Sequence, residues 1–324
     1  MSNCADCPRA QGASDQRWIA PKREMPLSGI LNVDKPPSIT SHDVVDAVRR
    51  VAGQRKVGHA GTLDPMATGV LLICLGRATR VAEYLMAGRK RYRATIMLGT
   101  TTDTYDADGE ITHSGGRTDF DRSEIETALS RFVGQSKQVP PMYSALKKEG
   151  QPLYKLARQG QVVAREARYV EIDQLELLDW TSPAVILELT CSPGTYVRSL
   201  AHDLGQALGS GAHLSALVRL ASGRFTLADA VSLQRLEEAF QHHQEESYLL
   251  PMDEAFLDWP ALILGSTDAR RVAQGQAVAG ASPSGSQDPE LALSRAYGPD
   301  GDFLAIMTFD SVSGLWRPKK VFTT

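Results

Sequence analysis

The chain is predicted to fold as an α+β protein, with a mixed, mainly antiparallel sheet flanked by helices and a small β-rich domain at its C-terminal end. Strand-like and helix-like segments alternate over residues 29–208 without the regular spacing of βαβ units. From Leu262 onward, short apolar runs are broken by Gly, Pro and Ser, which is typical of a small β domain. With 324 residues, of which 42% are hydrophobic, the chain is long enough for two domains.

The first elements are a strand, a helix and a buried strand. Residues 29–34 form a short apolar run, which predicts a strand. Thr40 or Ser41 caps the helix that follows, whose valines recur at helical spacing until Gly53 ends it. The apolar run over 70–75 then predicts a buried strand.

The later elements follow from the same patterns. Apolar residues alternate with polar or basic ones in the predicted strands, the helix over 123–133 begins at a capping residue, and the helix over 196–208 follows Pro193-Gly194. The predicted strands are 92–98, 170–178 and 185–191, and the predicted helices are 78–87, 123–133 and 196–208. Residues 99–116 are rich in Thr, Asp and Gly, which predicts a long loop. The acidic residues 229–250 predict a helical connector.

One carboxylate lies in a glycine-rich loop directly before the buried strand predicted over 70–75. The glycines of residues 58–69 free the backbone, and Pro65 favours an extended conformation at Asp64. A loop carboxylate anchored on a rigid strand suits catalysis, so Asp64 is a candidate catalytic residue. A turn in which Asp64 hydrogen-bonds its own backbone is the alternative.

The wording of this segment resembles a known catalytic motif. Gly-His-Ala-Gly-Thr-Leu-Asp-Pro over 58–65, followed by Ala-Thr-Gly-Val-Leu, closely resembles that of the TruB family of tRNA pseudouridine synthases. The resemblance covers about residues 28–225 in order, with a weaker match to the end. It continues at Leu31–Pro37, Lys90–Arg93, Val139–Lys147 and Gly194–Arg198.

The resemblance implies an isomerase that converts uridine 55 in the T-loop of tRNA to pseudouridine, after flipping the base out. It implies a pseudouridine synthase core over 28–250, with an RNA-gripping insertion at about 137–168, and a PUA-like RNA-binding β-barrel over 251–324. Residues 1–27 precede the resemblance and are predicted to be a flexible leader. The reaction breaks the C1′–N1 glycosidic bond of the uridine and joins C1′ to C5 of the same base. We therefore expect neither a cofactor nor a metal.

The resemblance also implies roles for six residues at the site. Asp64 would be essential, by attack on the sugar or the base or by shielding positive charge on the ribose, and the sequence leaves these routes open. Arg198 would keep the carboxylate ionised through a two-point contact. Tyr92 would stack on the extruded base. The other substrate-binding positions are His59, Tyr196 and Leu217.

Basic residues are segregated along the chain, although its formal net charge is −3. Residues 17–100 carry a net charge of +8 and residues 132–168 carry +5, which is typical of a surface that binds a polyanion. The predicted RNA-binding residues are Lys35, Lys90, Arg91, Lys147, Lys148 and Arg158. In the family the leucine that matches Leu217 is usually followed by two arginines. Here Val218 replaces the first of them, which puts one predicted contact with an RNA phosphate in doubt.

We expect a cytoplasmic monomer that binds the T-arm of tRNA without a guide RNA or a membrane. The sequence has no apolar run of the roughly 18 residues that span a bilayer, and residues 1–27 are no secretory signal. Cys4 and Cys7 have metal-ligand spacing, but a lone pair is a weak metal signal.

Three other functions are compatible with parts of the sequence. A non-catalytic RNA-binding or folding protein could use the same basic surface, but intact Asp64, Tyr92 and Arg198 favour activity. A guide-RNA-dependent synthase is disfavoured by the basic insertion near Lys147 and by the acidic connector. A carboxylate glycosidase would need a second, paired carboxylate.

Overall fold

The computed structural model describes residues 26–144, 146–148, 150–159, 161, 163–282 and 292–322. Most of the leader, with Cys4 and Cys7, lies outside the described residues. So do the side chains of Lys147, Lys148 and Arg158. No helix in the described part of the chain is long and apolar enough to cross a membrane.

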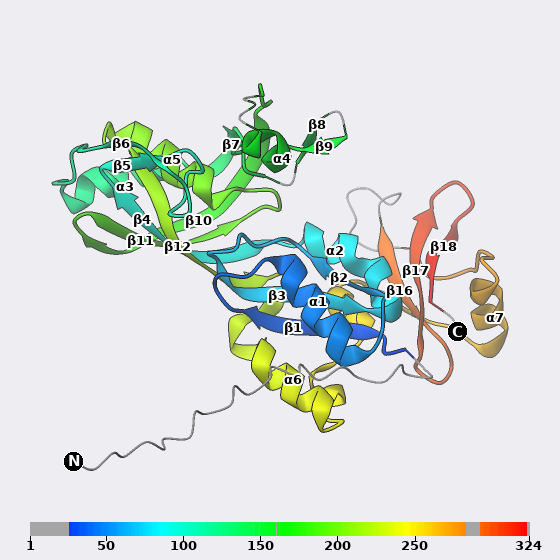
Figure 1. The fold of residues 1–324 in the computed structure, drawn as a ribbon. Coiled ribbons are helices and arrows are strands. Elements are labelled where there is room, and N and C mark those ends of the chain that lie inside the picture. Colours follow the sequence, from blue (N-terminus) through cyan, green and yellow to red (C-terminus); the bar gives the residue numbers. More distant parts are fainter. Residues whose placement is uncertain are drawn as a thin grey trace, which may run out of the picture.

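Ten strands of the described chain form one large mixed sheet (Figure 1). β1 pairs with β14 and β3 pairs with β12 in parallel, and the other strand pairs are antiparallel. The predicted mixed, mainly antiparallel sheet is therefore confirmed. In sheet order the strands are β14 (Val231–Ser232), β1 (Gly29–Lys35), β3 (Thr68–Leu75), β12 (Ala212–Ser222), β4 (Lys90–Leu98), β11 (Ala184–Cys191), β10 (Arg168–Thr181) and β7 (Gly134–Gln138), with β2 (Val57–Ala60) on β3 and β13 (Phe225–Thr226) on β12.

Helices cover this sheet where the sequence patterns predicted most of them. α1 begins at a capping box between Thr40 and Asp43 and ends at Gly53, whose φ of 61° is left-handed. The predicted helix over 78–87 is instead a 3₁₀ helix, η1, followed by α2. The helices are α1 (Ser41–Ala52), η1 (Gly76–Val81), α2 (Ala82–Ala87), α3 (Arg122–Ser130), α5 (Val197–Leu208), η2 (Leu227–Asp229), α6 (Leu233–Gln241), η3 (Glu245–Tyr248) and η4 (Met252–Phe256).

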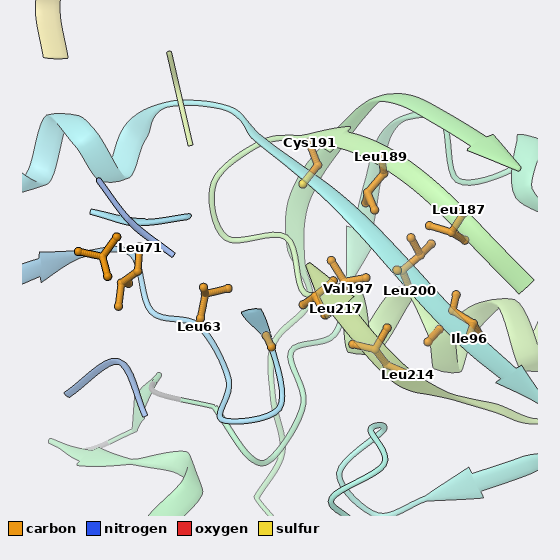
Figure 2. Packing of buried hydrophobic residues seen from close by; sticks show 14 of the residues in the cluster. Leu63, Leu71, Ile96, Leu187, Leu189, Cys191, Val197, Leu200, Leu214 and Leu217 are labelled. Carbon is orange, nitrogen blue, oxygen red and sulfur yellow. The ribbon is translucent and has the colours of Figure 1, made fainter. Parts of the chain in front are cut away.

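β3 is apolar along its whole length because both of its faces are buried. Leu71 and Ile73 point into one core that includes residues of α1, α3, α5 and α6. Leu72 and Cys74 point into a second core that includes η1, α2 and the C-terminal residues Ile306 and Phe322. Figure 2 shows the first core, in which Leu63, just before Asp64, lies between Leu71 and the pair Val197 and Leu217. The strand that carries the Asp64 loop is therefore held from two sides.

Several segments of the large domain differ from the sequence-based prediction. Residues 99–116 are not a plain loop, because β5 (Thr100–Thr102) and β6 (Ile111–Ser114) pair as a hairpin. The central strand β12, which carries Leu217, was not predicted, and neither were β2 and β7. The insertion holds β8 (Lys147–Lys148) and β9 (Gln151–Pro152), which pair, followed by α4 (Leu153–Arg158).

The C-terminal part is β-rich, as predicted, but its described residues form no closed barrel. Four strands make a single sheet, and α7 (Ser266–Ala273), which was not predicted, packs against it. The sheet order is β15 (Ala261–Ile263), β16 (Leu293–Tyr297), β17 (Phe303–Asp310) and β18 (Leu315–Val321). Arg77 and Arg80 of η1 donate to the carbonyls of Phe322 and Val321, so this sheet is docked on the large domain.

Candidate active site

The loop that carries Asp64 is braced by hydrogen bonds from α1 and β1. Ser41 at the start of α1 bonds both backbone groups of Leu63, at 3.1 Å to the carbonyl oxygen and 2.8 Å to the amide nitrogen. Lys35 at the end of β1 donates to the carbonyl of Pro65 at 3.1 Å. The two residues that flank Asp64 are therefore held by hydrogen bonds, which fixes the backbone that presents its side chain. The side chain is 31% exposed.

Arg198 makes the predicted two-point contact with Asp64. Its Nη2 donates to Oδ1 at 3.1 Å, and its Nε lies 2.9 Å from Oδ2. Arg198 is in the first turn of α5, and its side chain is only 5% exposed. The guanidinium therefore contacts both carboxylate oxygens, through one hydrogen bond from Nη2 and one ion-pair contact from Nε that lacks hydrogen-bond geometry. Such a charged pair favours the ionised carboxylate.

A second carboxylate, Asp106, holds the other edge of the same guanidinium. Nη1 of Arg198 donates to Asp106 Oδ2 at 3.0 Å, and Nη2 donates to the carbonyl of Tyr143 at 2.8 Å. Asp106 also accepts from the Thr104 hydroxyl at 2.6 Å and is 5% exposed. These contacts fix the direction in which Arg198 presents its fork to Asp64.

Opposing effects set the pKa of Asp64. Burial raises the pKa above the usual 3.8, and Arg198 opposes this rise. The negative charge of Asp106 adds to the rise, whereas Lys35 lowers it. Without Arg198 the carboxyl would therefore be harder to ionise, so the arginine favours the anionic form of Asp64.

The aromatic and apolar residues predicted for the substrate lie on the strands and helix that surround Asp64. Tyr92 of β4 is half-buried, burial raises its pKa, and the Asp64 charge adds to that rise, which places the two side chains within electrostatic reach. Leu217 of β12 is 7% exposed. Tyr196 is the N-cap of α5, and Gln138 holds its backbone, accepting from the amide at 2.8 Å and donating to the carbonyl at 3.0 Å.

His59 lies on β2 and is neutral at pH 7. Burial lowers its pKa below 6.5, and the positive charge of Arg219 lowers it further. Its Nδ1 is buried with no hydrogen-bond partner among the described residues. A neutral ring is suited to stacking against RNA and is poorly placed to supply a proton.

Comparison with known proteins places this geometry in a family. The model of the TruB family pseudouridylate synthase N-terminal domain matches residues 49–197, and that of the tRNA pseudouridylate synthase B C-terminal domain matches residues 198–257. The chain belongs to the TruB family. The tRNA pseudouridine synthase B of Pseudomonas aeruginosa is 44% identical over 86% of this chain and 91% of its own length, and that of Geobacter sulfurreducens is 42% identical over 90% and 95%.

Solved structures share the TruB-type fold of this chain. A crystal structure of a Cbf5-Nop10-Gar1 complex contains a chain that matches with a TM-score of 0.69 and 26% identity, over 91% of this chain and 85% of that one. A chain in an H/ACA RNP bound to a substrate RNA containing 2′-deoxyuridine matches with a TM-score of 0.69 and 24% identity, over 97% and 93%.

Two of the predicted RNA-binding lysines are buried, and the prediction of phosphate contacts is corrected for them. Lys35 is 0% exposed, and its ammonium donates to the carbonyls of Pro36, Ile39 and Pro65. Lys90 donates to the carbonyls of Met86 and Gly88 beyond the end of α2. Burial lowers the pKa of each lysine to about 8. Both lysines therefore stabilise the fold by bonding backbone carbonyls.

The other predicted RNA-binding residues lie on β4 and in the insertion. Arg91 is 52% exposed and pairs with Glu188 at 3.3 Å, so its guanidinium remains accessible. The backbone of Lys147 and Lys148 forms β8, and Arg158 ends α4. Their contacts with RNA stay predictions.

Three residues of the site were missed by sequence reasoning: Asp106, Gln138 and Arg219. Asp106 lay in a segment interpreted as an ordinary polar loop. The spacing of Thr104 and Asp106, which share a hydrogen bond, is a turn signal that was available. Gln138 bonds backbone groups of a distant segment, for which a single sequence carries no signal. Arg219 occupies the second of the two family arginine positions after Leu217, but it is buried and bonds carbonyls of the Asp64 loop, a role that the sequence did not indicate.

Proposed function

We propose that the protein is a tRNA pseudouridine synthase that isomerises uridine 55 in the T-loop. The observation that carries the proposal is the contact of buried Arg198 with both carboxylate oxygens of partly exposed Asp64, in the loop that bears the TruB motif. The arginine keeps an anionic carboxylate at a position that an extruded base can reach. Activity on tRNA uridine is the activity of the curated TruB relatives.

In the proposed reaction the uridine C1′–N1 bond breaks, the uracil turns, and C5 bonds to C1′ before the C5 proton leaves. Asp64 acts on the ribose or the base, by covalent attack or by stabilising charge and removing a proton. Tyr92 stacks on the flipped base, and Leu217 lines its apolar pocket. His59 and Tyr196 contact the RNA around it. Among the described residues no group of His, Cys, Asp and Glu side chains could hold a metal.

We infer that different parts of the chain perform catalysis and bind RNA. Residues 28–250 form the catalytic domain, and the insertion at about 137–168 closes on the T-arm through Lys147, Lys148 and Arg158. The C-terminal domain over 251–324, to which the four-stranded sheet belongs, is a PUA-like RNA-binding module. The protein works in the cytoplasm as a monomer and without a guide RNA.

The proposal is tested by incubating the purified protein with an unmodified tRNA transcript, in EDTA and without a cofactor. Pseudouridine is then mapped by carbodiimide treatment and primer extension. A single new stop at position 55, absent from the reaction without protein, supports the proposal. Modification at another position would refute the assigned target, and no modification of any uridine would refute the activity.

A further inference from the structure

The large sheet has a narrow junction in its middle. β12 and β3 are registered at only two positions, where Val218 faces Thr68 and Arg219 faces Gly69. On either side the ladders are long, because β12 pairs with β4 and β3 pairs with β1 along most of their lengths. The sheet is therefore two halves joined by a short parallel contact, and Figure 1 shows β3 and β4 on opposite sides of it.

The active-site residues come from both halves. Asp64 precedes β3 in one half, whereas Tyr92 lies on β4 in the other half and Arg198 lies on α5, which packs against β4 and β12. The short contact between β3 and β12 therefore sets how the catalytic loop meets its partners.

Arg219 spans this junction with its guanidinium. Its side chain is buried, and each of its three nitrogens donates to a backbone carbonyl of the Asp64 loop or its flank. Nε bonds Val70 at 2.6 Å, Nη2 bonds Gly61 at 3.0 Å and Nη1 bonds Thr62 at 3.3 Å. One rigid fork thus ties together the beginning and the end of the loop.

The surroundings of Arg219 leave little freedom at this point. Gly69 has a φ of 96°, and a Cβ there would overlap the Arg219 carbonyl. On the opposite side Arg219 is the cross-strand partner of Tyr92, whose pKa it lowers against the effect of burial. Leu217, two residues earlier, shares its face of β12. Arg219 is therefore in contact with the loop on one side and with the base-stacking tyrosine on the other.

A buried guanidinium is costly, and no carboxylate in the described chain lies within ion-pair distance of this one. The three hydrogen bonds to loop carbonyls offset the cost of removing this guanidinium from water. A lysine at position 219 would keep the positive charge but would place all its donors on one nitrogen. That ammonium cannot reach the three carbonyls that the planar guanidinium bonds through three separate nitrogens.

We propose that Arg219 is a positioning residue that fixes the Asp64 loop relative to Tyr92 across the sheet junction. It acts through the loop backbone and touches neither the base nor the Asp64 carboxylate. The inference rests on the proposed function, because its effect is read as the rate of pseudouridine formation.

The test compares Arg219→Lys and Arg219→Gln with a matched control, Asn32→Ala. Asn32 is also a buried polar residue of the same sheet that bonds a distant carbonyl, that of Thr226, but its bond does not reach the Asp64 loop. Each protein is checked for its folded fraction and melting temperature. The single-turnover rate is then measured at saturating tRNA, together with the dissociation constant of the tRNA and amide hydrogen exchange over residues 61–70.

Displacing a catalytic group by about 1 Å costs roughly 100-fold in rate, so we expect each Arg219 variant to lose at least about tenfold per folded molecule. The tRNA dissociation constant should change less than about threefold, and exchange over 61–70 should become faster. The control should keep the wild-type rate even if its melting temperature falls. A rate loss that only follows the unfolded fraction, or an equal loss in the control, would overturn the inference. An inactive wild type in this assay would instead refute the proposed function.

Discussion

Arg198 joins two carboxylates, with Nη2 bonded to Asp64 Oδ1 at 3.1 Å and Nη1 bonded to Asp106 Oδ2 at 3.0 Å. Arg198 and Asp106 are each 5% exposed, whereas Asp64 is 31% exposed. The buried carboxylate therefore anchors the cation, and the exposed carboxylate is the one that can reach a substrate. Asp106 therefore supports Arg198, whereas Asp64 is the carboxylate available for the reaction.

Arg198→Lys should lower the single-turnover rate by at least about tenfold while tRNA affinity stays within about threefold, because an ammonium cannot reproduce a two-point contact. The substitution keeps the charge, so the loss would report geometry. Rapid-quench assays at saturating tRNA provide the measurement. A lysine variant with the wild-type rate would show that the two-point contact is unnecessary.

Asp106→Ala should destabilise the fold by about 1–3 kcal/mol, since Nη1 of buried Arg198 loses its carboxylate acceptor while the contacts with Asp64 and the Tyr143 carbonyl remain. Urea unfolding measures this loss, and the rate of the folded fraction should fall as well. Asp106→Asn is the matched control because its amide oxygen can still accept from Arg198. The asparagine variant should be the milder of the two, and equal effects would argue against an anchoring role.

The pH profile of kcat/KM should have an acid limb set by Asp64. Its pKa is raised above 3.8 by burial, and the ionised form is the active one, so activity is full above the raised pKa and falls as pH drops through it. Arg198 opposes that rise, so Arg198→Met should move the limb to higher pH. A limb that stays in place in the methionine variant would contradict the electrostatic role.

Charge reversal of Lys147 and Lys148 to Glu should weaken tRNA binding and flatten its salt dependence by about 0.7–0.9 per lost phosphate contact. The single-turnover rate at saturating tRNA should stay near wild type, because Asp64 and its partners are unchanged. Arg131→Glu, an exposed reversal on the residue after α3, is the control. Equal salt slopes for both variants would refute a specific grip by the insertion.

The features that could be predicted from the sequence are encoded locally. The helix α1 follows from its cap, its valines and Gly53, and β3 follows from a run that is apolar because both faces are buried. The pair of Asp64 and Arg198 was reached through motifs that are each contiguous in sequence. Local pattern and family motif therefore located the centre of the site.

The remaining features depend on contacts between distant segments. β12 was missed because its polar and apolar residues alternate weakly, and its place is set by pairing with β4. Lys35 and Lys90 were interpreted as surface charges, since a sequence does not show which carbonyls will enclose an ammonium. Asp106 and Arg219 each bond residues far away in the chain, so only the fold reveals their roles.

The central claim is that the Asp64 carboxylate performs the isomerisation, and Asp64→Asn tests it most directly. The substitution keeps the shape of the side chain and removes its charge. Tritium release from tRNA labelled at uridine C5 should become undetectable, while the tRNA dissociation constant stays within about threefold of wild type, because the carboxylate acts on the reaction and contributes little to the interface. Release at a tenth of the wild-type rate or more, from protein free of wild-type enzyme, would contradict the account.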